Sequence, residues 1–331
     1  MKLVKFVLGC LDCEERSKLQ FFFRIWKKCF KKNATMTRNA QNRSKLERPN
    51  IAVTQGEIYY REIVGMKYLG GKQRLGKHLA PVLHEIWENN EDLNGYLEPF
   101  CGSLGVLKNM TDIDTKNIQA NDYHADLIQM WKEVKAGTFK YPTSISEEEY
   151  LEAKKMKSPS AHKAFVGFGM SFGGRYFGAY SQKYLNGKKE DFCKEMVNSL
   201  TRTAPKIQNV KFTNKDYRKL TPKKKLIYCD PPYAYNKYPI KYRRDVKKYD
   251  TFDNEEFWDV VRKWSKNNLV VVSETTAPDD FVEVWNQKRY RSAAQSKKTR
   301  FSEKSDAPSD THTVEKLFVH KSNAKKAQLD N

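Results

Sequence analysis

The chain has 331 residues, 39% of them hydrophobic and 13% aromatic, which excludes a wholly disordered protein and allows one large domain or two ordinary ones. No run of about 18 apolar residues occurs, and the short apolar stretch at residues 3–11 is interrupted by Lys5, so we expect neither a transmembrane helix nor a signal peptide. The formal net charge of +21 indicates a polyanionic partner without identifying it.

The first segment of the chain, residues 1–58, combines basic residues, Asn and Ser without a sustained period. We expect an accessory or disordered extension there. The six cysteines are scattered, which is typical of a reducing compartment, so we expect an intracellular protein that is not secreted. Cys10 and Cys13 form half of a zinc-binding pattern, but no second pair follows, so no metal is predicted.

Apolar residues with the spacing of an α-helix occur after this segment. Apolar residues at intervals of three and four predict a helix over 76–89, in which Pro81 fits only the first turn. Ser146 and Glu149 have the spacing of a capping box and predict a helix start. Residues 165–180 interleave glycine with aromatic residues and fit neither the helical nor the strand period. Further helices are predicted over 106–110, 126–134, 191–200 and 257–264.

Short apolar runs between these helices predict strands. One of them, residues 269–273, is almost continuously apolar, as strands of a parallel sheet are. Strands that alternate with helices predict an α/β fold with a Rossmann-like, doubly wound and mostly parallel sheet. The predicted strands are 95–100, 118–120, 210–213, 226–229, 269–273 and 314–320.

The tetrad Asp230-Pro231-Pro232-Tyr233 directly follows one predicted strand. Ligands of open α/β sheets bind at the carboxyl ends of the strands, where this tetrad would lie. A Pro-Pro pair is also common after a strand as a simple turn, so the tetrad alone leaves both interpretations open.

Other segments have the composition of a ligand site. Residues 98–105, Glu-Pro-Phe-Cys-Gly-Ser-Leu-Gly, lead from a strand into a glycine turn and a predicted helix, where a ligand can approach the backbone and the helix N-terminus. Asn121-Asp122 ends the next strand, where an acid can bind ribose hydroxyls or cap a helix. Tyr68-Leu69-Gly70-Gly71-Lys72 precedes both, and Lys215-Asp216-Tyr217 follows the strand at 210–213.

In this order and spacing, the segments resemble those of the Dam-type DNA adenine-N6 methyltransferases, most closely the phage- and virus-encoded branch. In chain order, the motifs of that family are G-G-K, an E-P-F glycine loop, N-D-x-x-x-D-L-I and D-P-P-Y. In this chain the third motif is Asn121–Ile128. Gly167–Arg175 and Glu315–Phe318 also fit, and the resemblance covers residues 63–321. Leu104 departs from it, because many members have a second glycine there, and we expect a slightly different turn.

The resemblance implies an S-adenosylmethionine-dependent enzyme in the cytoplasm of a bacterial or virus-infected cell. It also implies a catalytic domain at 59–136 and 205–322, a mainly helical target-recognition insert at 137–204 and a tail at 323–331. It implies that Asp122 holds the ribose hydroxyls of the cofactor and that Asp230 touches both the cofactor and the target. The implied cofactor-binding residues are Tyr68, Lys72, Phe100, Gly102, Gly105, Asp122, Asp216, Tyr217 and Asp230. The implied catalytic residues are Asp230, Pro231, Pro232 and Tyr233.

The chemistry of the tetrad agrees with this placement. An exocyclic adenine amine is a poor nucleophile because its lone pair is delocalised into the ring. The Asp230 carboxylate and the Pro231 carbonyl can accept its two hydrogens, with the two prolines restricting the backbone, and Tyr233 can stack on the base. Direct transfer of an activated methyl group then needs positioning more than covalent catalysis. A base inside a duplex cannot reach such a pocket, so we expect base flipping.

The positive charge is concentrated around the same tetrad. Residues 206–249 contain 14 basic and 3 acidic side chains, with tyrosines among the lysines. A solvated lysine-rich surface is one interpretation, and a loop that follows DNA phosphates is the one we favour. We expect duplex DNA as the partner, no membrane, and a monomer or weak dimer on DNA. The predicted DNA-binding residues are Lys237, Lys241, Arg243, Arg244, Lys247, Lys248 and Arg175. For Arg175, a simple packing or surface role is the alternative.

Two alternatives remain at this stage. A tetrad of this kind also serves RNA adenine or other planar amine and amide substrates, so the target could differ while the fold stays the same. A catalytically inactive DNA-binding module is the second alternative, although the intact Asp122, Asp216 and Asp230 argue against it.

Overall fold

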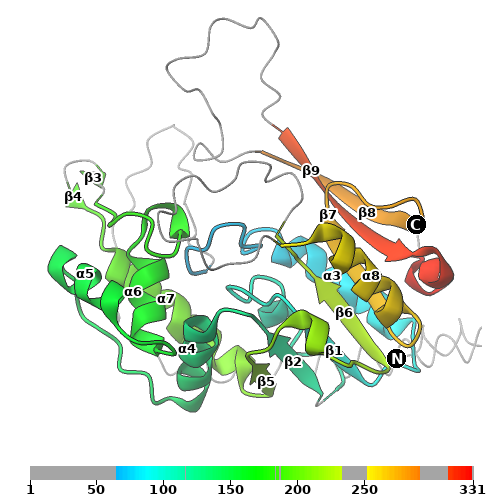
Figure 1. Ribbon diagram of the computed structural model, residues 1–331, viewed down its shortest axis with the longest axis horizontal. Helices are drawn as coiled ribbons and strands as arrows, with labels where there is room; N and C mark the ends of the chain where they lie inside the picture. The colour runs from blue at the N-terminus through cyan, green and yellow to red at the C-terminus, as the bar shows by residue number, and fades with distance from the viewer. Residues whose placement is uncertain are drawn as a thin grey trace, which may run out of the picture. The chain divides into compact units, whose positions relative to one another are not determined.

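A seven-stranded sheet forms the centre of the fold (Figure 1). Five adjacent strands are parallel to one another. The next strand across the sheet is antiparallel to both of its neighbours. The predicted Rossmann-like, mostly parallel sheet is therefore confirmed. Across the sheet the strands are β5 (Val210–Thr213), β2 (Ile118–Asn121), β1 (Gly95–Glu98), β6 (Lys225–Cys229), β7 (Leu269–Glu274), the antiparallel β9 (His312–His320), and β8 (Phe281–Tyr290).

The computed structural model describes residues 65–115, 117–182, 184–185, 188–232, 252–290 and 312–329. The expectations for residues 1–58, including Cys10 and Cys13, lie outside these ranges. No helix within them combines the length and apolar character needed to cross a bilayer.

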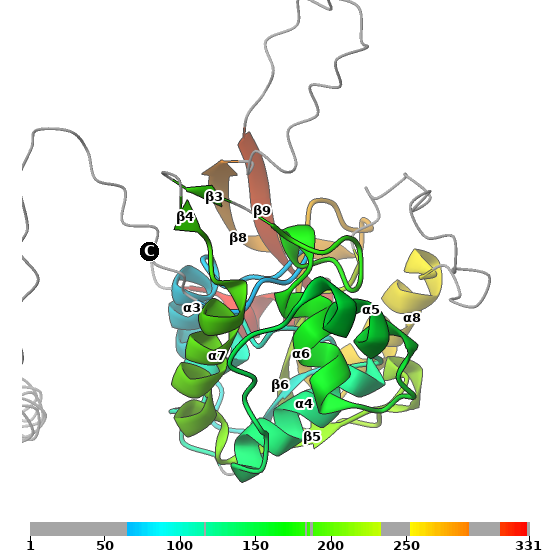
Figure 2. The same cartoon turned by 90° about the vertical axis from the view of Figure 1, so that its left-hand side faces the viewer.

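Helices cover both faces of the sheet, since α3 (Gly76–Glu88) and α8 (Asn254–Ser265) lie on opposite sides of it (Figure 2). Successive residues of a strand point to opposite faces, so each strand contributes to two cores. Leu97 and Ile227 belong to the core beneath α8, whereas Tyr96 belongs to the core that includes α3. This two-sided burial explains the continuous apolar runs of β6 and β7.

Further helices lie between β2 and β5 in the sequence. They are α4 (Ala125–Ala136), α5 (Glu147–Lys155), α6 (Ala161–Gly169) and α7 (Phe192–Thr203), with a short hairpin of β3 (Tyr184–Leu185) and β4 (Lys188–Lys189). The predicted capping box is confirmed, because the Ser146 hydroxyl accepts from the Glu149 backbone N–H and the Glu149 carboxylate accepts from that of Ser146. The predicted boundaries of the domain and its insert stay a prediction.

One buried carboxylate on α4 holds later segments of this helical region in place. Asp126 is 3% exposed, and its Oδ1 accepts from the Ser160 backbone N–H at 2.7 Å. Its Oδ2 accepts from the Tyr176 hydroxyl at 2.6 Å and from the Ser158 hydroxyl at 2.9 Å. A buried carboxylate with three donors is a strong anchor, so Asp126 holds the start of α6 and the glycine-aromatic segment against α4.

Two predictions about helices were wrong, one for the segment 106–110 and one for the place of Pro81 in its helix. The segment predicted as a helix over 106–110 is only a 3₁₀ turn, Leu107–Asn109, because the chain leaves the glycine turn with i→i+3 bonds and turns away after Met110. The glycine turn therefore has no long helix N-terminus beyond it. Pro81 lies at the sixth position of α3, beyond the first turn. Pro81 has no backbone N–H to donate to the Lys77 carbonyl one turn earlier. Both residues are on the exposed face of the helix, where water can donate to that carbonyl instead.

Two elements had no recognisable period in the sequence. Helix α6 lies largely within the glycine-aromatic stretch and is buried almost all round, so its apolar residues show no stripe. Strand β8 lies at the edge of the sheet and is only partly buried, so polar residues interrupt its alternation.

Candidate cofactor and catalytic site

The predicted site residues lie where parallel strands end. Phe100 follows β1, Asp122 follows β2, Asp216 follows β5 and Asp230 follows β6. Because these four strands are adjacent and parallel, their carboxyl ends share one edge of the sheet. The fold therefore brings together residues that are distant in the sequence, as ligand sites of open α/β sheets require.

Asn121 fixes the spacing of this edge. Its side chain is fully buried, and its amide nitrogen donates to the carbonyls of Pro99 at 3.1 Å and Lys215 at 2.9 Å. Its amide oxygen accepts from the Lys215 backbone N–H at 3.1 Å and the Thr213 hydroxyl at 2.8 Å. One side chain thus joins the ends of three strands, a role that its position in the motif did not indicate.

The G-G-K segment packs directly on the glycine turn. A Cβ at Gly76 would lie 2.0 Å from the Gly105 carbonyl oxygen, and one at Gly105 would lie 2.7 Å from the Lys72 carbonyl carbon. A Cβ at Gly71 would lie 2.8 Å from the Ser103 hydroxyl. Any side chain at Gly76 or Gly105 would force the two backbones apart, so these glycines are needed for close approach.

Gly102, Asp122 and Tyr68 form the next part of the site. The Gly102 backbone N–H donates to Asp122 Oδ2 at 2.9 Å, and that of His124 donates to Oδ1 at 2.9 Å. Burial raises the pKa of Asp122, and these backbone donors oppose the shift. Gly102 has φ +46°, and a Cβ there would lie 3.1 Å from Tyr68 Cε1, so the Tyr68 ring lies against the turn.

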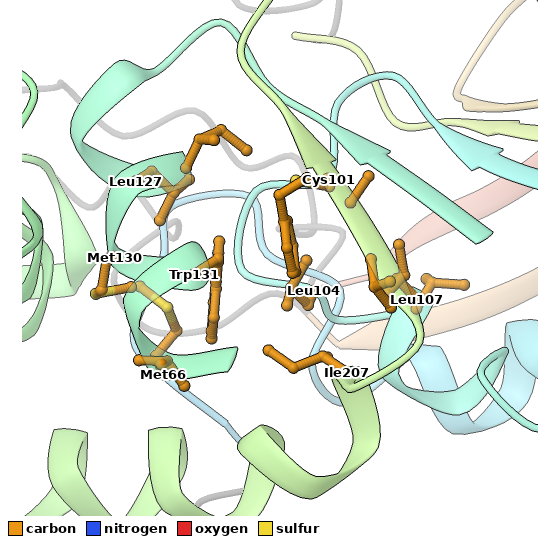
Figure 3. Packing of buried hydrophobic residues seen from close by; sticks show 14 of the residues in the cluster. Met66, Cys101, Leu104, Leu107, Leu127, Met130, Trp131 and Ile207 are labelled. Atoms are coloured by element: carbon orange, nitrogen blue, oxygen red, sulfur yellow. The ribbon is translucent and has the colours of Figure 1, made fainter. Parts of the chain in front are cut away.

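Leu104 occupies a backbone conformation that normally favours glycine. Its φ is +57°, although its side chain is fully buried. Figure 3 shows it packed among Cys101, Leu107, Trp131 and Ile207. The packing of this side chain therefore offsets a backbone strain of about 1–2 kcal/mol.

The balance between backbone strain and side-chain packing at Leu104 predicts an unusual order of stability for its alanine and glycine variants. Leu104→Ala removes core contacts worth about 2–5 kcal/mol and keeps the strain. Leu104→Gly removes the same contacts and relieves the strain, so we expect the glycine variant to unfold at the same or higher denaturant concentration than the alanine variant. At ordinary positions glycine is less stable than alanine by about 0.5–1 kcal/mol. Chemical denaturation would contradict the left-handed assignment if alanine proved the more stable of the two.

A buried ion cluster lies at the end of β6. Lys72 Nζ donates to Asp230 Oδ1 at 2.6 Å and lies 3.5 Å from Glu315 Oε1. Lys72 and Glu315 are 4% and 1% exposed, whereas Asp230 retains 19% exposure. The Ser273 hydroxyl donates to the same Glu315 oxygen. Sequence reasoning placed Lys72 beside the cofactor and assigned Glu315 no role, although a charged residue within the apolar run of β9 was a signal.

An aromatic cluster lies beside the end of β5. The ring of Tyr217 lies 5.1 Å from that of Phe100 and 5.8 Å from that of Phe252. Burial raises the pKa of Tyr217 to about 12, which keeps its hydroxyl neutral. The Asp216 carboxylate instead accepts from the Arg218 guanidinium, and this donor lowers the pKa of Asp216. The predicted roles of Asp216 and Tyr217 beside the cofactor stay predictions.

The glycine-aromatic segment lies against Tyr68. The Leu69 backbone N–H donates to the Gly174 carbonyl at 3.3 Å, and a Cβ at Gly174 would lie 2.4 Å from the Tyr68 nitrogen. Arg175 is exposed on this segment, close in the chain to Phe172, which is 63% exposed. Leu69 is 52% exposed. Phe172 and Leu69, which sequence reasoning missed, add apolar surface beside the predicted DNA-binding residue Arg175.

Ring contacts continue from this segment towards the glycine turn. The Phe168 ring lies 5.0 Å from Tyr68 and 4.8 Å from Tyr176, and the His124 ring lies 4.4 Å from Tyr176. The helical region between β2 and β5 therefore contributes directly to the wall of the site. Tyr233 and the basic residues Lys237, Lys241, Arg243, Arg244, Lys247 and Lys248 lie outside the described ranges.

The chain matches a known protein family over most of its length. The family model described as D12 class N6 adenine-specific DNA methyltransferase matches residues 68–166 and 172–305. The matched residues include the glycine turn, Asp122 and the tetrad at 230–233, and they end before Glu315. No curated protein matched the chain.

Proposed function

The chain belongs to the family of D12 class N6 adenine-specific DNA methyltransferases, and we propose that it transfers a methyl group from S-adenosylmethionine to the N6 amine of an adenine flipped out of duplex DNA. One observation carries the proposal. The Asp230 carboxylate follows β6 and is mostly buried, and the Asp122 carboxylate follows β2 at the same edge of the sheet. A hydrogen-bond acceptor for the amine and an acid suited to ribose hydroxyls therefore lie along one edge of the sheet, where open α/β folds bind their ligands.

The described residues fit the proposed cofactor. The Ser103 hydroxyl, in a residue only 4% exposed, has no hydrogen-bond partner among the described residues, and a buried polar group without a partner is rare. The Asp122 carboxylate accepts backbone bonds from Gly102 and His124, and because a carboxylate can accept about four hydrogen bonds, it keeps acceptor capacity for a ribose hydroxyl. S-adenosylmethionine, when bound, supplies a methyl group already activated on a sulfonium.

The tetrad would activate and orient the target amine. The Asp230 carboxylate accepts one amine hydrogen and the Pro231 carbonyl accepts the other, which favours a pyramidal and more nucleophilic nitrogen. The cyclic side chains of Pro231 and Pro232 restrict the backbone that presents both acceptors. Orientation of this kind supplies much of the rate enhancement in a direct transfer.

Base flipping follows from the depth of the acceptor. The Asp230 side chain is 19% exposed and is bonded to a lysine that is 4% exposed. A base held in a duplex stack cannot bring its amine to a group at that depth, and extrusion costs only a few kcal/mol, about what stacking and edge contacts return.

Arg175, Phe172 and Leu69 would form part of the DNA-binding surface. A cation next to exposed apolar side chains suits a phosphate beside an unstacked base. All three side chains are exposed, and the bond from the Leu69 N–H to the Gly174 carbonyl holds this segment beside Tyr68, which supports contact near the target nucleotide. The monomer or weak dimer expected on DNA stays a prediction.

The basic residues after the tetrad should determine the salt dependence. We expect that replacing Arg243, Arg244, Lys247 and Lys248 together with Gln reduces the slope of log affinity against log salt by about 3 to 4, because each lost phosphate contact removes about 0.9. Fluorescence anisotropy of a labelled duplex between low and high salt measures the slope. Replacing four lysines elsewhere, at positions 132, 135, 155 and 157, is the charge-matched control. An unchanged slope in the first variant would remove residues 234–249 from the interface.

The proposed function is tested by methyl transfer from labelled S-adenosylmethionine to duplex DNA, RNA and protein. We expect label in DNA, recovered as N6-methyladenine after digestion. Label in RNA alone would favour the RNA-methylating alternative. Calorimetry that detects DNA binding without cofactor binding would favour an inactive DNA-binding module.

A further inference from the structure

Among the residues that the structure describes, the carboxylates of Asp230 and Glu315 both lie close to the Lys72 ammonium, and only Asp230 belongs to the proposed reaction. Asp230 Oδ1 lies 2.6 Å from Lys72 Nζ, and Glu315 Oε1 lies 3.5 Å from it. The three residues come from separate parts of the fold, namely the segment before α3, the end of β6, and β9. We refer to Asp230, Lys72 and Glu315 as the buried triad.

Glu315 is held firmly in this arrangement. It is 1% exposed, and the hydroxyl of the fully buried Ser273 on β7 donates to Oε1, the oxygen nearest to Lys72. The pairing of β7 with β9 places Glu274 opposite Lys316 and so sets this part of β9 beside the end of β7. A side chain so deeply buried is out of reach of DNA, so any effect of Glu315 on the reaction must pass through a neighbouring group.

Lys72 is the neighbouring group that can carry such an effect. An ammonium bonded to Asp230 withdraws electron density from the carboxylate that must accept the adenine amine. A second carboxylate on the other side of the ammonium attracts it away from Asp230, and in a buried site this attraction is weakly screened. Glu98 at the end of β1 and Glu274 at the end of β7 are further buried acids at this edge. Burial raises the pKa of Glu98 well above the usual range, which favours its neutral form.

Resting on the proposed function, we propose that Glu315 is a positioning residue for methyl transfer, which shares Lys72 with Asp230 and thereby sets how strongly Asp230 accepts the target amine. The triad carries one net negative charge when all three groups are ionised, so Asp230 keeps acceptor capacity although it is paired. Without the Glu315 charge, Lys72 would bind Asp230 more tightly and compete with the amine.

The first test is Glu315→Gln, which keeps the size and an oxygen acceptor for Ser273 but removes the charge. We expect the single-turnover rate to fall by about a hundredfold, as small displacements of catalytic groups can produce, while KM for DNA and the affinity for S-adenosylmethionine stay unchanged. Glu283→Gln is the matched control, because Glu283 pairs with Lys316 at 2.8 Å on the same sheet but at a half-exposed position. An unchanged rate in Glu315→Gln would overturn the proposal.

A double-mutant cycle with Lys72→Met separates positioning from a general structural role. If Glu315 acts through Lys72, Glu315→Gln has no further effect on the rate in the Lys72→Met background. An equal loss in both backgrounds would overturn the proposal. Should Glu315→Gln fold poorly, Ser273→Ala loosens Glu315 without changing any charge, and we expect a smaller rate loss per folded molecule. No such loss would also overturn the proposal.

The two proposals fail in distinguishable ways. Absence of DNA methylation by the unmodified chain would overturn the proposed function, and the role of Glu315 with it. Methylation by the unmodified chain, with equal rates in Glu315→Gln and Glu283→Gln, would overturn the role of Glu315 alone.

Discussion

Replacing Asp230 with Ala is expected to reduce methyl transfer to duplex DNA by about a thousandfold or more, because it removes the charged acceptor that the target amine needs. DNA binding should persist, since the carboxylate is mostly buried and at most a small part of it can touch the duplex. Single-turnover incorporation of a labelled methyl group measures the first effect, and electrophoretic mobility shift measures the second.

Two further variants separate chemistry from stability. Asp230→Asn keeps the shape and an oxygen acceptor, so we expect an intermediate rate. Asp92→Ala breaks an exposed Asp–Lys pair, Asp92 with Lys326 at 2.8 Å, and should leave the rate unchanged. Retained turnover in a folded Asp230→Ala protein would contradict the proposed mechanism.

Replacing Asp122 with Ala is expected to weaken S-adenosylmethionine binding by about a hundredfold, or about 3 kcal/mol, through the loss of charged hydrogen bonds to the ribose hydroxyls. The same change leaves the backbone N–H groups of Gly102 and His124 without their acceptor, which loosens the turn. Isothermal titration calorimetry with the cofactor measures the affinity.

The control for this variant is Asp112→Ala. The Asp112 side chain is 80% exposed and pairs with His84 at 3.3 Å, so its removal should change neither affinity nor stability. Thermal unfolding of both variants shows whether the fold is retained. An Asp122→Ala protein that binds the cofactor as tightly as the unmodified chain would exclude Asp122 from the ribose site.

The elements that sequence reasoning predicted well are those with a strong local signal. The strand at 210–213 was predicted to the residue, and the helix at 76–89 to within one residue. In both elements the apolar residues recur at the spacing of that element, every second residue in the strand and every three or four residues in the helix. This spacing can be read from the local sequence. The carboxyl-end positions of Asp122, Asp216 and Asp230 followed in turn, because parallel strands place their ends at one edge.

The features that sequence reasoning did not predict depend on what surrounds each segment in the fold. Leu104 adopts a left-handed backbone because its side chain fills the core around Trp131, and no local preference of leucine indicates that. Pro81 is accommodated in the second turn of α3 because that face is exposed to water. Helix α6 shows no stripe because neighbouring helices cover it on most sides.

By itself the sequence determined the fold class, the order of the site segments and the resemblance to adenine methyltransferases, because period and motif spacing are read along the chain. Only the tertiary structure decided which side chains share a hydrogen bond. Asn121 joins three strand ends, and Lys72 lies between Asp230 and Glu315. These contacts depend on the order of the strands in the sheet and on the position of β9 between β7 and β8. The spacing of two residues along the chain does not specify the distance between their side chains.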